Sequence, residues 1–118
     1  MKDLSDYYAK ALNIGVHNVR RITIDPNILN NDHQNYQRNR IEDKVLHHMK
    51  HWDKEDYNSG IVAMRPDGSY WLINGQHHSD AAVRLGISVV QYYIFNSTDW
   101  TYEKGIFDLF QKLQSEEK

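Results

Sequence analysis

The sequence predicts a single α+β domain in which about four helices pack against a small mixed sheet of about four strands. Segments with apolar residues at helical spacing alternate with β-prone segments along the chain. A tight-turn sequence, Pro66–Ser69, separates two β-prone runs and predicts a β-hairpin. No repeat or low-complexity stretch divides residues 1–118, so one domain is the simplest organisation.

The elements are expected in the order α, β, α, β, β, α, β, α. Helices are expected where apolar side chains recur every three or four residues, and strands where β-branched and aromatic residues cluster or alternate. In chain order the expected ranges are 2–12, 19–24, 41–52, 61–65, 70–73, 80–85, 88–95 and 101–114. Ile41, Val45, Met49 and Trp52 form the expected buried stripe of the second helix. The Asn-rich segment 30–39 is expected to be a polar loop with Tyr36 as its only core residue.

Composition excludes several classes of mechanism. The 118 residues contain no cysteine, which excludes a thiolate nucleophile, a redox pair and a cysteine zinc site. The 14 Lys and Arg residues against 16 Asp and Glu give a net charge of -2, so any polyanion site must be local. No apolar run is long enough to span a bilayer, and Met1–Ser5 lacks the apolar core of a signal peptide. We therefore expect a cytoplasmic protein that does not contact a membrane.

The most informative segment runs from the end of the hairpin into the next helix. Gly75 permits a sharp turn there, and the first N–H groups of the following helix have no intrahelical partners. A phosphate could lie against these amides, His77, His78 and Ser79. The alternative is that Ser79 only caps the helix and both histidines bind backbone groups. Spacing alone leaves both interpretations open.

A family resemblance rests on this segment. Asn74-Gly75-Gln76-His77-His78, with Ala81-Ala82 and Leu85-Gly86 after it, resembles the Gly-x-His-Arg or Gly-Glu-Arg-Arg box of the ParB/sulfiredoxin superfamily. Upstream, Ile22–Asp25 is similar to its first strand, Tyr36–Arg38 to its Gln-Arg element and Ile61–Arg65 to the strand before its hairpin turn. The resemblance covers residues 19–95 most strongly. The box is similar to that of phage- and plasmid-borne ParB-like domains, which implies a mobile-element origin.

The resemblance implies a ParB/sulfiredoxin-like fold with a phosphate-binding cleft between the box and the Gln-Arg loop. The implied ligands are a nucleotide, such as CTP or ATP with Mg²⁺, or DNA, and a host or phage protein is a further expected partner. The residues implied to hold phosphate are Gly75, Gln76, His77, His78, Ser79, Gln37, Arg38 and Arg40. From the residues themselves, Arg38 and Arg40 beside Tyr36 suit a phosphate or a base, or else belong to a solvated loop.

The chain departs from the superfamily at several positions. The sulfiredoxin nucleophile would fall at Gln76, so a sulfiredoxin-type reductase is excluded. Partition proteins carry a metal-linked Glu at that place, and Gln76 therefore weakens cation binding there. The phosphate-clamping Arg of the family corresponds to His78, which is mostly neutral near pH 7 and has no bidentate fork. The second ParB box, Glu-Asn-x-Gln-Arg, is absent from the sequence, so clamp loading in the partition manner is not expected.

Three functions remain open. The first is a nucleotide- or nucleic-acid-binding domain with phosphate held at Gly75–Ser79 and by Arg38. The second is a phosphoryl-transfer enzyme in the same cleft, either a metal-dependent nuclease, an NTPase or a small-molecule kinase, with His77 as the catalytic base. The third is a protein-interaction module. Its aromatic surface would be drawn from Tyr92, Tyr93, Trp100 and Tyr102, since alternation in a strand keeps Tyr92 and Tyr93 from both facing one core. The alternative is that the second of these two tyrosines packs under the C-terminal helix.

Metal sites are weakly indicated. His47 and His51 share one helix face, but His48, His77 or His33 would have to complete a site, so the pair indicates a solvated polar face rather than a metal site. Two acidic groups, Glu42-Asp43 and the set Asp53, Glu55 and Asp56, fit a helix start and a helix end as well as they fit metal-binding carboxylates. The sequence therefore predicts no metal site.

Overall fold

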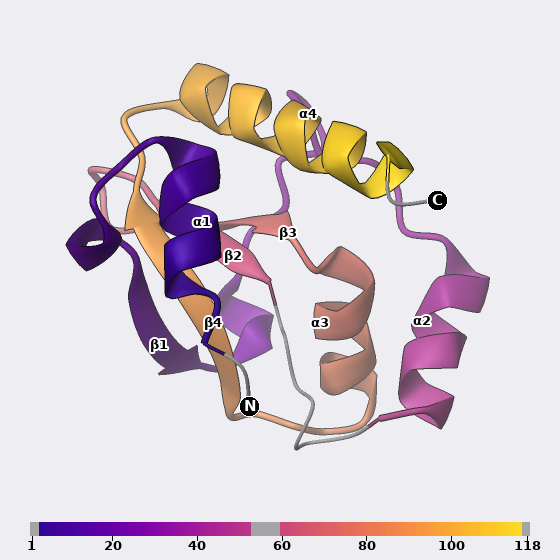
Figure 1. Cartoon of the computed structure of the whole chain (residues 1–118). Helices are drawn as coiled ribbons and strands as arrows, with labels where there is room; N and C mark the ends of the chain where they lie inside the picture. The colour runs from indigo at the N-terminus through magenta and orange to yellow at the C-terminus, as the bar shows by residue number, and fades with distance from the viewer. Residues whose placement is uncertain (1–2, 53–59, 117–118) are drawn as a thin grey trace.

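The described part of this computed structural model, residues 3–52 and 60–116, forms four α-helices and one four-stranded sheet. Their order is the predicted one (Figure 1). The elements are α1 (Ser5–Leu12), β1 (Arg20–Ile24), α2 (Glu42–Lys50), β2 (Ile61–Met64), β3 (Tyr70–Asn74), α3 (Gln76–Arg84), β4 (Val90–Asn96) and α4 (Trp100–Glu116), with short 3₁₀ turns at Val16–Asn18 and Pro26–Ile28. No helix within the described ranges is long and apolar enough to cross a membrane.

The sheet is mixed, with strand order β1-β4-β2-β3. β1 pairs with β4 and β2 with β3 in antiparallel fashion, whereas β2 and β4 run parallel. β2 and β3 form the predicted hairpin, whose turn is closed by a hydrogen bond from Arg65 N to Ser69 O at 2.9 Å. The chain passes from β3 to β4 through α3, and the start of α3 lies directly at the end of β3.

Helices cover both faces of the sheet. Tyr93 and Phe95 of β4 belong to one core with α1 and α4, whereas Tyr92 and Ile94 belong to the other core with α3. Tyr92 is 0% exposed and Tyr93 is 5% exposed. The hypothesis that one of these two tyrosines belongs to an exposed patch is therefore wrong, and the alternative that it packs under the C-terminal helix holds for Tyr93. A strand covered on both faces buries both sets of alternating side chains.

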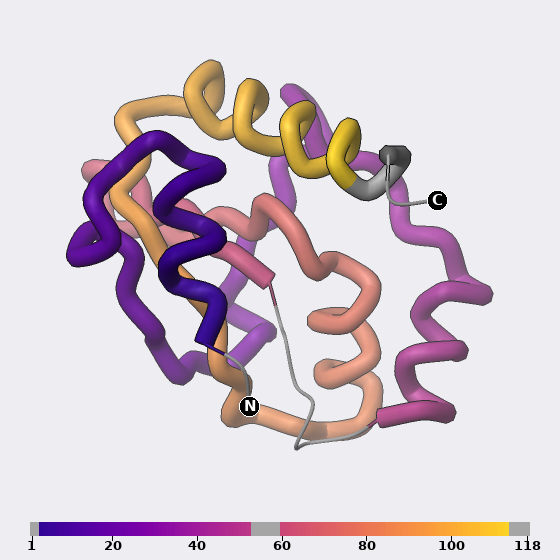
Figure 2. The backbone as a smooth tube through the Cα atoms, viewed as in Figure 1, coloured from indigo at the N-terminus to yellow at the C-terminus, as the bar shows by residue number. Residues whose placement is uncertain are grey.

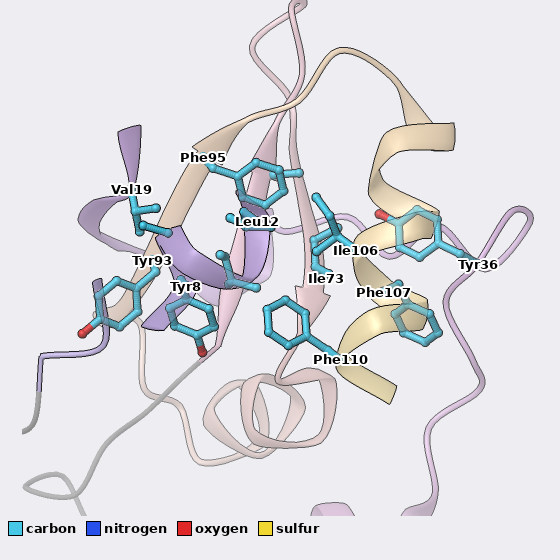
Figure 3. Packing of buried hydrophobic residues seen from close by; sticks show 13 residues of the cluster. Tyr8, Leu12, Val19, Tyr36, Ile73, Tyr93, Phe95, Ile106, Phe107 and Phe110 are labelled. Atoms are coloured by element: carbon cyan, nitrogen blue, oxygen red, sulfur yellow. The ribbon is translucent and has the colours of Figure 1, made fainter. Parts of the chain in front are cut away.

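The larger core is rich in aromatic rings (Figure 3). Tyr8 of α1 meets Phe110 of α4 edge-on, with ring centroids 5.7 Å apart. Tyr36 packs on Phe107 at 5.5 Å and is 8% exposed, so the prediction that this tyrosine anchors the polar loop is confirmed. The packing fixes α4 and the loop around Tyr36 on the same side of the sheet.

α2 lies outside α3 rather than on the sheet (Figures 1 and 2). Of its predicted buried stripe, Val45 is fully buried, Met49 and Trp52 are half-buried, and Ile41 is 50% exposed. The prediction that Ile41 is buried is wrong, and the reason is geometric. A helix that packs on one other helix buries only a narrow line of residues, and Ile41 precedes the first turn. The packing of α2 on α3 places the start of α2 beside the start of α3.

Candidate anion-binding pocket

A single glycine joins β3 to α3. Gly75 has φ 100° and ψ 23°, a left-handed conformation that L side chains rarely adopt. α3 therefore begins at Gln76, earlier than the predicted start at residue 80. Its first intrahelical hydrogen bond runs from Ser79 N to Gly75 O at 2.9 Å, so the amides of residues 76–78 precede the helical ladder. The positive end of the α3 dipole is thus presented at the end of β3.

Gly60, which sequence analysis did not single out, lies tightly against this turn. Its φ is 102°, and a Cβ on it would come within 1.9 Å of the Asn74 carbonyl oxygen. Gly60 O also accepts a hydrogen bond from Tyr93 N at 3.1 Å, which ties the start of β2 to β4. The close backbone approach of residue 60 to residues 74 and 75 leaves no room for a side chain. In the sequence, this close backbone approach is indicated by a glycine immediately before a β-prone run.

A pocket of about 440 Å³ opens at the start of α3. Most of the predicted phosphate-binding residues line it: Gln37, Arg38, Gly75, Gln76, His77 and His78. Sequence analysis missed the contribution of α2, which adds Lys44 and His48, and of α1 and α4, which add Tyr8, Phe107 and Gln111. The structure thus brings together the glycine turn and the Gln-Arg loop, as expected, and adds a lysine to the same pocket.

Arg40 and Ser79 do not line this pocket. They line a smaller recess of about 170 Å³ on the other side of Gln76, where Arg40 forms an ion pair with Asp80 at 2.7 Å. Ser79 is buried, and its hydroxyl is hydrogen-bonded to the Tyr92 hydroxyl at 2.8 Å. Ser79 is also inside the helix, because α3 begins at Gln76, so it is not the cap that the alternative interpretation assumed.

The loop that carries Arg38 is fixed by the two buried side chains that immediately precede this residue. Tyr36 donates its hydroxyl hydrogen to Glu103 Oε1 at 2.7 Å, and Gln37 Nε2 donates to the Leu72 carbonyl at 3.0 Å. The Arg38 side chain itself is exposed and donates a hydrogen bond to Gln111 of α4. Arg38 is therefore held over the pocket by a neutral amide, which a charged acceptor can displace.

His77 bonds to the backbone of the α2 start. Its Nε2 accepts a hydrogen bond from Ile41 N at 2.9 Å, so Nε2 carries no proton and Nδ1 is the protonated nitrogen. Burial, followed by the positive charge of Lys44, lowers the pKa of His77 below its usual value. In this arrangement His77 can donate a hydrogen bond to a ligand but has no free lone pair. The geometry does not support the expected role of His77 as catalytic base.

His78 lies in an aromatic stack between α2 and α3. Its ring stacks on Trp52 with centroids 4.4 Å apart and planes at 18°, and it meets His48 edge-on at 5.3 Å. Burial, and then the charge of His48, lowers the pKa of His78 to about 4. His78 is therefore neutral at pH 7 and contributes shape and stacking to the pocket wall, but no charge.

The histidine pair that was considered as a metal site has no third ligand beside it among the described residues. The rings of His47 and His51 are 4.5 Å apart on the exposed face of α2. Within residues 3–52 and 60–116, no group of three or more His, Cys, Asp or Glu side chains could hold a metal ion. Glu42 forms an ion pair with Arg84 of α3. Asp53, Glu55 and Asp56 lie outside the described residues.

Comparison with known proteins places this arrangement in a known fold. No family model and no curated protein matches the chain. Among solved structures, the truncated chromosome-partitioning protein ParB from Caulobacter crescentus in complex with CTP-γ-S is 21% identical, with a TM-score of 0.61 over 80% of this chain and 53% of that one. Sulfiredoxin from Arabidopsis thaliana is 19% identical, with a TM-score of 0.56 over 70% of this chain and 91% of that one. The chain has the ParB/sulfiredoxin fold.

The predicted ParB/sulfiredoxin-like fold is thereby confirmed. The same Caulobacter ParB in complex with its centromeric parS site superposes with a TM-score of 0.57 at 19% identity, over 73% of this chain and 44% of that one. The chain therefore spans about half the length of the ParB chains that it matches. At 21% and 19% identity, these structural matches show the fold alone.

Proposed function

We propose that this ParB-like domain binds a phosphate group of a nucleotide or of a nucleic acid in the pocket at the start of α3. One observation carries the proposal: Arg38 and Lys44 line the same pocket as the N-terminus of α3, and its described lining includes no Asp or Glu. Amides at a helix start and fixed cations attract anions together, because the partial charge of the helix dipole adds to the full charges of the side chains.

The hydrogen-bonding groups suit phosphate oxygens. Arg38 is exposed and bound to a neutral amide of Gln111, and a phosphate is the stronger acceptor for its guanidinium. His77 presents Nδ1–H as a neutral donor, because its Nε2 is occupied by Ile41 N. Phosphate would thus meet an arginine, a lysine and a histidine N–H without having to break a buried ion pair.

The comparisons support the ligand class at the level of the fold. One ParB structure of this fold contains CTP-γ-S and another contains parS DNA. CTP, ATP and Mg²⁺ as ligands, and a mobile-element origin, remain predictions from the resemblance of the Gly75–His78 box. We limit the proposal to phosphate binding, because this chain spans about half of those ParB chains.

The alternatives have less support. Phosphoryl transfer needs a positioned base, and the Nε2 lone pair of His77 is engaged by Ile41 N. The interaction-module hypothesis relied on four aromatic residues, of which Trp100 and Tyr102 are exposed but Tyr92 and Tyr93 are buried, so only half of that surface is present. The binding proposal requires neither a base nor an exposed aromatic surface.

The experiment is a fluorescence titration with labelled nucleotides and a short labelled oligonucleotide at several salt concentrations. Arg38→Ala and Lys44→Ala each remove one cation from the pocket and should weaken binding about tenfold or more. Arg21→Ala and Lys50→Ala are matched controls, because both side chains are exposed and neither lines the pocket. Absence of binding, or binding that neither salt nor the pocket variants change, would contradict the proposal.

A further inference from the structure

The pocket holds a small and fixed amount of positive charge. Its described lining includes two side chains that stay charged at neutral pH, Arg38 and Lys44. The lining histidines are mostly neutral at pH 7, because burial lowers the pKa of His48, His77 and His78 below its usual value. The charge available to neutralise a ligand within the described lining is therefore that of one guanidinium and one ammonium.

Carboxylates close to the pocket are already paired with arginines. Asp80 forms ion pairs with Arg40 at 2.7 Å and with Arg84 at 3.2 Å, on the side of α3 that lines the smaller recess. Glu42 is paired with Arg84. Gln76, at the first position of α3 and on the pocket wall, is an uncharged amide. The described lining thus offers no carboxylate that could share a divalent cation with a ligand.

These charges match one class of phosphate ligand. A phosphate monoester carries about -1.5 to -2 charges near pH 7, which one arginine and one lysine neutralise. A triphosphate carries more charge, and proteins usually bind its Mg²⁺ through one or two carboxylates together with the phosphates. From the charge and composition of the pocket we infer that it binds a ligand with a single terminal phosphate, held without a metal ion. This inference rests on the proposed function and specifies its ligand.

The rest of the lining suits a neutral body attached to that phosphate. Ile73 and Phe107 add apolar groups to the lining, and Asn39 and Gln111 add amide groups. A volume of about 440 Å³ is within the range of pockets that enclose small molecules. A nucleoside monophosphate and the 5′-phosphorylated end of an oligonucleotide both combine one terminal phosphate with a neutral sugar and ring. They share the chemistry that the pocket recognises.

The test compares ligands that differ only in phosphate number. The wild-type protein is titrated by calorimetry with AMP, ADP and ATP and with CMP, CDP and CTP, each once with EDTA and once with MgCl₂. We expect the monophosphates to bind as tightly as the triphosphates or more tightly, and their affinity to be the same with EDTA and with Mg²⁺. An oligonucleotide with and without a 5′-phosphate identifies the source of the phosphate, and it should bind more tightly with the phosphate.

A charge variant gives a second readout. Gln76→Glu adds a carboxylate beside the ligand and should weaken metal-free monophosphate binding about tenfold or more. Gln34→Glu adds the same charge on an exposed turn residue that lines neither pocket, and should leave the affinity unchanged. Circular dichroism of both variants checks that each is folded.

The outcomes separate this inference from the proposed function. A triphosphate that binds about tenfold more tightly than the monophosphate, and only with Mg²⁺, would overturn the inference while supporting the proposed function. Unchanged affinity of Gln76→Glu would also overturn it, because the phosphate would then lie elsewhere. Failure of every nucleotide and oligonucleotide to bind would overturn both.

Discussion

Arg65 holds the buried carboxylate of Glu103 with two hydrogen bonds, from Nε to Oε2 at 2.8 Å and from Nη2 to Oε1 at 2.9 Å. The carboxylate, on a side chain that is 0% exposed, also accepts hydrogen bonds from the Tyr36 hydroxyl and the Ser97 hydroxyl, both at 2.7 Å. Arg65 reaches Asp32 as well, at 2.9 Å. The Arg65–Glu103 pair therefore joins the β2–β3 hairpin, α4 and the loop that leads to the pocket.

The first prediction concerns this ion pair. Arg65→Met should lower the free energy of unfolding by about 3 to 5 kcal/mol, because it leaves the buried Glu103 carboxylate without its cation. The double variant Arg65→Met/Glu103→Leu should be more stable than Arg65→Met alone, since the fully buried Glu103 charge is then removed together with its cation and only Asp32 loses an ion-pair partner. Urea unfolding measures both values.

The control is Arg20→Met, an exposed arginine of β1, which should change stability by less than about 0.5 kcal/mol. A loss of less than about 1 kcal/mol in Arg65→Met would show that the Glu103 carboxylate is not charged or not buried in solution.

The second prediction concerns the loop that carries Arg38. Tyr36→Phe keeps the ring against Phe107 but removes the hydroxyl that donates to Glu103, and should cost about 1 to 3 kcal/mol of stability. Burial, followed by the hydrogen bond and charge of Glu103, raises the pKa of Tyr36, so this hydroxyl stays protonated at every pH of interest. Nucleotide affinity should fall as well, because the loop next to Arg38 loses a contact.

Tyr7→Phe removes a hydroxyl from a residue that is 46% exposed, and should alter neither stability nor affinity. If Tyr36→Phe were as stable as the wild type, the loop would not depend on the Glu103 contact. Urea unfolding and nucleotide titration of the two variants provide the comparison.

Sequence analysis succeeded where local chemistry decides the structure. The Pro66–Ser69 turn fixes the hairpin, and helical spacing together with β-prone runs fixes the order of elements. Tyr36 was identified as a core residue because it is the one large apolar group in a polar segment. Residues of the Gly75 turn and Arg38 of the Gln-Arg loop were placed at one site through the resemblance, and they line one pocket.

The rest depended on contacts between distant segments. Which face of β4 is buried depends on where α1, α3 and α4 pack, so alternation alone could not decide between an exposed patch and a second core for Tyr92 and Tyr93. Lys44 and His48 reach the pocket only because α2 packs on α3. Glu103 did leave a signal: it lies three, four and seven residues before Ile106, Phe107 and Phe110, within the apolar stripe of α4. A charged residue in such a stripe indicates a buried ion pair.

The third prediction concerns the glycine under the pocket. Gly60→Ala forces a left-handed φ of 102° on a side chain and places Cβ 1.9 Å from Asn74 O, so the β3–α3 turn has to move. Strain and displacement together should cost more than about 3 kcal/mol and should weaken nucleotide binding.

Gly68→Ala is a matched control at the hairpin tip. Its φ is 86°, but a Cβ there meets nothing within 4 Å, so only the backbone strain of about 1 to 2 kcal/mol is expected, with affinity unchanged. Equal thermal stability of the two variants would show that the close approach of Gly60 to Asn74 is absent in solution.

The fourth prediction concerns pH and the α2–α3 contact. The pKa of His78 falls from 6.5 to about 4 in the folded protein because of burial and then His48, so the unfolded chain binds more protons between these values. Stability is therefore complete above about pH 6.5 and is lost as the pH falls towards 4. Lowered pKa values of His48 and His77 act in the same direction, and a protonated His77 could no longer accept the hydrogen bond from Ile41 N.

His78→Phe isolates this effect, because a phenyl ring can still stack on Trp52 but cannot take up a proton. Thermal unfolding followed from pH 7 to pH 4 should show a smaller loss of melting temperature in His78→Phe than in the wild type. His17→Phe, a change at an exposed histidine remote from α2, should retain the wild-type dependence on pH. If the wild type and His78→Phe lost stability in parallel, the imidazole of His78 would be accessible to solvent and α2 would not be held by neutral histidines.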